Sequence, residues 1–179
     1  MKKRWPSHLT YHSISHTIDV ANVSNNYISH YDIDKDNADL IRIAAICHDI
    51  GYLTSPVNHE ELGIKKVKPF LEKVLTKKQI KTVNGMIRAT KVPQKPNTFY
   101  EEVLADADLD YLGRTDYDTL SRKLYQEFLY YDVLKNEKEW LTMQVSFLEN
   151  HSYHTAFAKE NRSPVKMVKL KALKSKIQP

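Results

Sequence analysis

Histidine and aspartate residues in three separate segments of the chain have the types and spacing that metal-dependent chemistry requires. Five of them form the predicted site: His12 and His16 in YHSISHTIDV, His48 and Asp49 in AAICHDIGY, and Asp106 in VLADADLDYLG. Imidazole nitrogens and carboxylate oxygens make a mixed ligand set, without the thiolates that favour structural zinc. The sequence therefore predicts one divalent cation, and Mn²⁺, Fe²⁺, Co²⁺, Ni²⁺, Mg²⁺ and Zn²⁺ all remain candidates.

The surroundings of two of these carboxylates indicate that each needs a cation. Asp49 closes an apolar helix and Asp106 lies in the apolar frame VLADADL, and a buried carboxylate is costly unless it is paired or bound to metal. Together with His16 and His48 they supply four ligands, which leaves two positions on a six-coordinate ion for water and a substrate oxygen. Such an ion lowers the pKa of its bound water and neutralises charge that develops on phosphoryl oxygens.

Helical spacing restricts which side chains can act together. His12 and His16 are four residues apart, so a continuous helix would present both on one face. Asp106, Asp108 and Asp110 follow one another in steps of two, and each step rotates about 200° around a helix, so the three carboxylates cannot all face inward. We expect Asp106 to face the metal and Asp110 to be a structural partner or a helix cap.

Apolar residues recur at helical spacing along the whole chain, and no segment alternates with period two, which predicts an all-α, single-domain helical bundle. Helices are expected over 15–30, from DIDKD to near Gly51, from Asn58, from Thr76, over about 101–111, 116–136 and 138–150, and after Pro164. Thr76 and Gln79 fit a capping box, and KVPQKPN reads as a loop. Ile18 is expected on the same side of its helix as Val20, and the helix from Asn58 is expected to carry Phe70 and Val74.

Composition narrows the class of protein. The chain has 179 residues, which suits one domain, and only four glycines, with no GxGxxG or GxxxxGK segment that could cradle a phosphate. Its single cysteine, Cys47, excludes an internal disulfide and fits a reducing compartment. No apolar run follows the basic first residues, and no stretch has the roughly 20 apolar residues of a membrane span. We expect a cytoplasmic protein without a membrane partner.

The net charge of +5 is unevenly distributed. Residues 159–179 carry seven basic residues and one acid, whereas residues 1–158 carry 20 basic and 21 acidic residues. We expect the catalytic domain over 1–158 and a basic C-terminal tail over 159–179, packed on the same domain or extending from it. A solvated helix face explains such a tail more simply than a nucleic-acid arm, so nucleic acid is disfavoured as a partner.

With a Y-H-x-x-x-H segment, an adjacent His-Asp pair and a distant L-x-D-A-D-L, the chain resembles the HD superfamily of metal-dependent phosphohydrolases. The segments NHEELG, DADLDYLGRTDY and FLENHSYHTAFA look like its bacterial branch of predicted phosphohydrolases. The resemblance implies His16, His48, Asp49 and Asp106 as the metal ligands. YHSISH is also similar to a segment of cyclic-nucleotide phosphodiesterases, and this likeness implies that His12 protonates the leaving group.

Other residues complete the expected site. His59 is the only histidine between the His-Asp pair and Asp106, and Thr90 stands where two-metal members of the superfamily have a further histidine. We therefore expect one metal, with His59 joining His12 and Asp49 as a catalytic residue. Arg88 and Arg114 are the candidates to bind the substrate phosphate through paired hydrogen bonds.

The function expected from the sequence is hydrolysis of a phosphate monoester or diester of a small molecule, a nucleotide by preference, by a metal-activated water. An alternative from another class is a non-catalytic HD-domain module that binds nucleotides or regulates a partner. Iron-dependent oxidation ranks lower, because such sites need more histidines than this chain supplies. The sequence leaves open whether the chain forms a homodimer.

Overall fold

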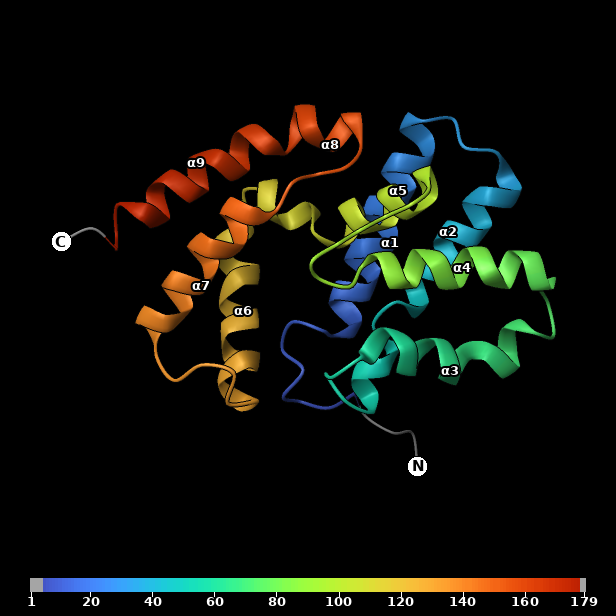
Figure 1. Ribbon diagram of the computed structural model, residues 1–179, viewed down its shortest axis with the longest axis horizontal. Helices are drawn as coiled ribbons and strands as arrows, with labels where there is room; N and C mark the ends of the chain where they lie inside the picture. Colours follow the sequence, from blue (N-terminus) through green and yellow to red (C-terminus); the bar gives the residue numbers. More distant parts are fainter. Residues whose placement is uncertain (1–4, 178–179) are drawn as a thin grey trace. The chain divides into compact units, whose positions relative to one another are not determined.

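The computed structural model describes residues 5–177, and within them the chain contains helices and no strand (Figure 1). The prediction of an all-α fold is confirmed. Contacts between residues divide the chain into two compact units. The central unit is Ile14–Asp108, and the terminal unit combines Met1–Ser13 with Leu109–Pro179. No helix in the described part is long and apolar enough to cross a membrane.

Five α-helices and one 3-10 helix form the central unit: α1 (Ile14–His30), α2 (Lys35–Cys47), η1 (Ile50–Leu53), α3 (His59–Leu71), α4 (Lys77–Ala89) and α5 (Phe99–Asp108). Helix α1 packs against α2 and α5, and α4 packs against α2, α3 and α5. Figure 1 shows α4 and α5, joined by the predicted loop at KVPQKPN, lying next to α1 and α2. The chain thus brings the end of α2, the start of α1 and the end of α5 into one unit.

Local hydrogen bonds explain where these helices begin and end. Thr76 and Gln79 form the predicted capping box at the start of α4. The second helix ends at Cys47, earlier than the predicted end near Gly51. Its end is closed by His48, whose ring Nδ1 lies 2.8 Å from the carbonyl oxygen of Ala45, one of the terminal carbonyls that a helix leaves without a partner in the helix.

Some apolar positions lie on the outside of their helices. Ile18 is 54% exposed, because the buried row of α1 includes His16 and Val20, each about 200° away from it around the helix. Phe70 is 67% exposed and Val74, beyond the end of α3, is 74% exposed. The prediction that Ile18 shares one side of its helix with Val20 is therefore wrong, and the helix predicted to carry Val74 ends before it, at Leu71.

The terminal unit contains η2 (Asp110–Gly113), α6 (Tyr117–Tyr130), α7 (Glu137–Asn150), α8 (Ala156–Asn161) and α9 (Ser163–Lys174). Tyr125, Leu134 and Trp140 form a buried cluster between α6 and α7. The helix predicted over 116–136 ends at Tyr130, because the backbone of Asp132 turns to φ 53° and the N–H of Val133 donates to Phe128 O at 2.9 Å. This closure is typical of a helix C-terminus.

The basic tail is folded. It contains the end of α8 and all of α9, and α9 packs against α7, α8 and η2 within its unit. Lys166, Leu170 and Leu173 are buried on α9. The tail is therefore partly a core element, not only a solvated face, and the domain boundary expected at residue 158 stays a prediction.

Candidate metal centre

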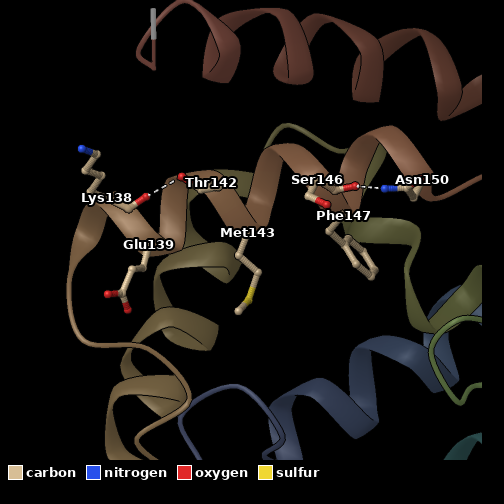
Figure 2. A pocket seen from close by; sticks show the side chains of 7 residues that line it. All are labelled: Lys138, Glu139, Thr142, Met143, Ser146, Phe147 and Asn150. Atoms are coloured by element: carbon tan, nitrogen blue, oxygen red, sulfur yellow. Dashed lines mark hydrogen bonds between the residues drawn. The ribbon is translucent and has the colours of Figure 1, made fainter.

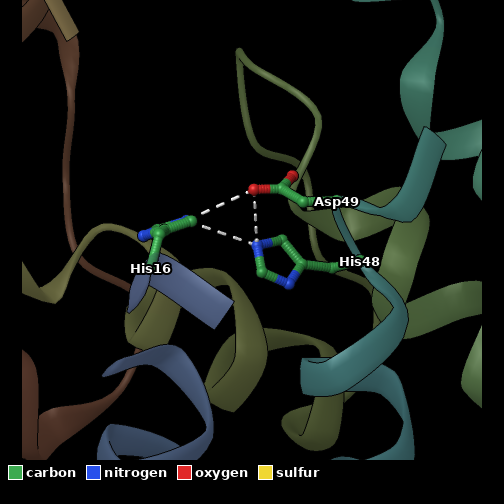
Figure 3. A group of neighbouring side chains, drawn as sticks. All are labelled: His16, His48 and Asp49. Carbon is green, nitrogen blue, oxygen red and sulfur yellow. Dashed lines mark hydrogen bonds and ion pairs between the residues drawn. The ribbon is translucent and has the colours of Figure 1, made fainter. Parts of the chain in front are cut away.

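The side chains of His16, His48 and Asp49 point toward one another inside the central unit (Figure 3). His16 lies in the first turn of α1, His48 follows the last residue of α2, and Asp49 precedes η1. All three are buried, and each offers one ligand atom within 4.8 Å of the others. Two predicted ligand segments thus meet at one point.

The distances between these atoms match those between neighbouring ligands of one ion. The Nε2 atoms of His16 and His48 are 3.4 Å apart, and Asp49 Oδ2 lies 3.4 Å from the first and 3.1 Å from the second. Ligands about 2.1 Å from a metal lie about 3.0 Å apart at an octahedral angle and about 3.4 Å apart at a tetrahedral one. The residues present therefore fit a single divalent cation.

The orientation of the His48 ring also suits a ligand. Its Nδ1 lies 2.8 Å from the carbonyl oxygen of Ala45, and a carbonyl can only accept, so Nδ1 carries the proton. In the neutral ring, Nε2 then holds the lone pair that faces His16 and Asp49. A metal-binding histidine is oriented in this way by a hydrogen bond through its other nitrogen.

Helix α5 brings a further carboxylate to the two histidines. Asp108 Oδ1 lies 3.1 Å from the Nε2 of His16 and 3.4 Å from that of His48. Asp106, the predicted ligand, is fully buried on the same helix. The contact of Asp108 was missed at the sequence level, because spacing alone cannot decide which of two nearby carboxylates on a helix faces a neighbour.

These contacts favour positive charge on the histidines when they are free of metal. Burial by itself lowers the pKa of His16, but hydrogen bonds and charges from Asp108 and Asp49 outweigh it and raise that pKa to about 9. The same balance raises the pKa of His48 well above its ordinary value. Burial raises the pKa of Asp108, yet its bonds to both histidines lower it to about 2. The carboxylates thus hold protons on the two imidazoles, and a metal cation bound at this cluster would displace those protons.

His59 lies beside the metal centre on the first residue of α3. Its Nδ1 is 3.2 Å from the Pro56 carbonyl oxygen, and its Nε2 is 3.5 Å from Asp49 Oδ1. Gly51 permits this arrangement, because a Cβ there would lie 1.8 Å from the main-chain oxygen of His59. The structure therefore brings the predicted residue His59 close to Asp49 Oδ1, the carboxylate oxygen that does not face His16 and His48.

His12 belongs to the terminal unit and does not lie on α1, which begins at Ile14. The prediction that His12 and His16 share a face of one helix is wrong. The buried carboxylate of Glu127 explains why: its Oε2 accepts the main-chain N–H groups of Tyr11 and His12, at 3.0 and 3.1 Å, and holds them in a bend.

The same carboxylate fixes the His12 ring. Burial raises the pKa of Glu127, but hydrogen bonds from His12 and the main chain lower it overall. An ionised carboxylate can only accept, so His12 Nδ1 donates to Glu127 Oε1. Glu127 gave no signal in the sequence, since it stands 115 residues away from His12.

The two predicted phosphate-binding arginines are engaged with acids. Arg88 forms an exposed, two-point ion pair with Glu61. Arg114, in the terminal unit, pairs with Asp116 and lies 3.6 Å from Asp110 Oδ2. Their role toward substrate stays a prediction.

A helical unit that gathers two imidazoles and carboxylates at ligand spacing defines a candidate metal-binding protein. The model of the HD domain family matches residues 13–111, more than half of the chain. The chain belongs to the HD domain family, whose members are generally metal-dependent hydrolases. No curated protein and no solved structure matches it.

Proposed function

We propose that this chain is a metal-dependent phosphohydrolase that cleaves a phosphate monoester or diester of a small molecule, preferably a nucleotide. The observation that carries the proposal is the convergence of His16 Nε2, His48 Nε2 and Asp49 Oδ2 at the spacing of ligands on one cation. One divalent ion is proposed at this point, and Mn²⁺, Fe²⁺, Co²⁺, Ni²⁺, Mg²⁺ and Zn²⁺ are the candidates.

Helix α5 supplies the fourth proposed ligand. Asp106 is fully buried there, and a metal cation is one of the partners that stabilise a buried carboxylate. Asp108 then serves as a charge partner that orients the imidazoles of His16 and His48. When bound, the ion lowers the pKa of a water molecule and neutralises charge on phosphoryl oxygens.

Two further histidines are proposed to move protons. His59 Nε2 lies 3.5 Å from Asp49 Oδ1, which is long for a direct hydrogen bond and suits a proton passed through solvent. His12 is proposed to protonate the leaving oxygen. Glu127 fixes its ring so that Nδ1 is the nitrogen bonded to the protein, which makes Nε2 the proposed donor.

The test is a phosphate-release screen on the full chain, first treated with chelator and then loaded with each candidate metal. The substrates are nucleoside monophosphates, cyclic nucleotides, sugar phosphates and p-nitrophenyl esters. We expect turnover that requires metal and disappears in His48→Ala. His30→Ala is the matched control, because His30 also belongs to the central unit but is exposed at the end of α1.

Two results would contradict the proposal. One is a metal-loaded protein that hydrolyses none of these esters, and such a protein that still binds nucleotides would be the non-catalytic module. The other is full activity in His48→Ala, which would place the chemistry elsewhere.

A further inference from the structure

A second candidate site lies wholly within the terminal unit and is formed by residues other than those assigned to metal. A pocket of about 620 Å³ opens where the loop after α7 meets α8 and α9. Its charged and hydroxyl-bearing lining residues include Lys159, Lys166, Lys174, Glu149, Ser152 and Ser163. Because Lys174 is paired with Glu149, two lysines contribute the net positive charge of this set.

Lys166 is the unusual member of the lining, because it is only 5% exposed. Its ammonium donates to the main-chain oxygen of His151, lies 3.3 Å from His151 Nδ1 and stands 5.7 Å from the centre of the Tyr153 ring. All three partners are neutral. Among the residues that the structure describes, no carboxylate forms an ion pair with this ammonium. Burial lowers the pKa of Lys166, as expected for a buried cation without a counter-ion.

The His151 ring, which contacts Lys166, has a buried nitrogen without a hydrogen-bond partner among the described groups. If its Nδ1 accepts from Lys166, this nitrogen, Nε2, carries a proton. The pocket is also lined by Ser163, the first residue of the twelve-residue helix α9, whose N-terminus has no side-chain cap. Free N–H groups at a helix start attract anions. Several independent features of this pocket thus favour a negatively charged ligand.

A second hollow of similar volume shows that size alone does not define the site. It measures about 630 Å³ and follows one face of α7, where Met143 and Phe147 point to the same side (Figure 2). Its only charged lining residues are Lys138 and Glu139, whose charges offset each other. The pocket beside α9 differs because the buried, positively charged side chain of Lys166 lines it.

We propose that the pocket formed by Lys166, Lys159 and the N-terminus of α9 binds a small phosphate-bearing anion through residues that the metal centre does not use. Lys159 and Lys166 form no ion pair with the residues that the structure describes, and their two charges match a dianionic phosphate group. Bound there, the anion would supply the counter-ion that Lys166 lacks and accept hydrogen bonds from the ammonium and from Ser163. This site needs no metal, so it does not depend on the phosphohydrolase proposal.

The test is calorimetric titration of the full chain with inorganic phosphate and with pyrophosphate, at constant ionic strength set with sodium chloride. The titration uses His48→Ala in the presence of chelator, which removes the proposed metal-dependent phosphate site. We expect saturable binding that Lys166→Met weakens by on the order of 10- to 100-fold. Lys171→Met is the matched control, because Lys171 is an exposed lysine of the same helix, and it should bind as before.

Thermal unfolding separates loss of binding from loss of the fold. Lys166→Met replaces a buried charge with an apolar side chain, so the variant should be at least as stable as the parent without phosphate. With chelator present, phosphate should raise the melting temperature of His48→Ala and leave that of the double variant with Lys166→Met unchanged. Equal phosphate binding in the Lys166 and Lys171 variants, or no saturable binding in the millimolar range, would overturn the proposal.

Discussion

The metal-free protein should show an unusual dependence of stability on pH, set by His16. In the folded chain the pKa of His16 is raised from 6.5 to about 9, chiefly by Asp108 and Asp49 against the opposing effect of burial. A group with a raised folded pKa contributes its full stabilisation below its unfolded pKa. That contribution is lost as pH rises from about 6.5 through 9.

The magnitude follows from the size of the shift. One pKa unit corresponds to about 1.4 kcal/mol, so the rise to about 9 corresponds to roughly 3 kcal/mol of stability in the metal-free chain. Asp108 takes part in the same interaction, and its pKa is lowered to about 2. A lowered carboxylate contributes above its unfolded pKa, so the contribution should also fade as pH falls from about 4 through 2. The stability conferred by this pair should therefore be greatest between about pH 4 and 6.5.

The assay is an NMR titration of the histidine ring signals in the presence of chelator, combined with urea unfolding at several pH values. His16→Gln assigns the His16 signal. We expect this ring to stay protonated at pH 8 and Asp108→Asn to lower its pKa. A His16 that titrates at or below pH 6.5, together with stability that does not fall between pH 6.5 and 9, would refute the reasoning.

Three further predictions concern Glu127, the two carboxylates Asp106 and Asp108 of α5, and Leu170. Glu127→Gln should lower the free energy of unfolding by about 1.5–3 kcal/mol in chemical unfolding. Because it disturbs the His12 ring, it should also slow turnover more for substrates with poor leaving groups than for p-nitrophenyl esters. Equal losses on both substrate types would rule out His12 as the acid. Asp106→Asn should abolish metal binding, whereas Asp108→Asn should weaken it by about 10- to 100-fold. If equilibrium dialysis shows the reverse order, Asp108 is the ligand and Asp106 the charge partner. Leu170→Ala should cost about 2–5 kcal/mol in a denaturant titration, whereas a cost near zero would show that α9 does not contribute to a core.

Local patterns predicted the fold well. The capping box at Thr76, the start of α3 next to Asn58 and the loop after α4 need only neighbouring residues, and the structure confirms them. Helix ends were less predictable, because hydrophobic periodicity does not report the backbone conformation that closes a helix. Periodicity continues through the segment after Tyr130, but the positive φ of Asp132 ends α6 there.

Some residues of the candidate sites could be recognised from the sequence and others only from the folded chain. His48 and Asp49 could be predicted as site residues because they are adjacent in the sequence at the end of an apolar helix. Glu127 and Lys166 were not, because their significance comes from partners or burial that only the folded chain reveals. His12 was misplaced on a helix for the same reason, since the carboxylate that bends its backbone lies on α6.

The measurement that tests the central claim most directly is the metal content of the purified chain. Elemental analysis after loading and desalting should find about one divalent ion per chain in the parent and in the control Asp39→Asn, whose side chain is half-exposed on α2. His48→Ala and Asp49→Ala should each lose it, because each removes one atom of the cluster that the fold assembles. Full retention of metal by either of these variants, with the fold intact by circular dichroism, would contradict the assignment of this centre.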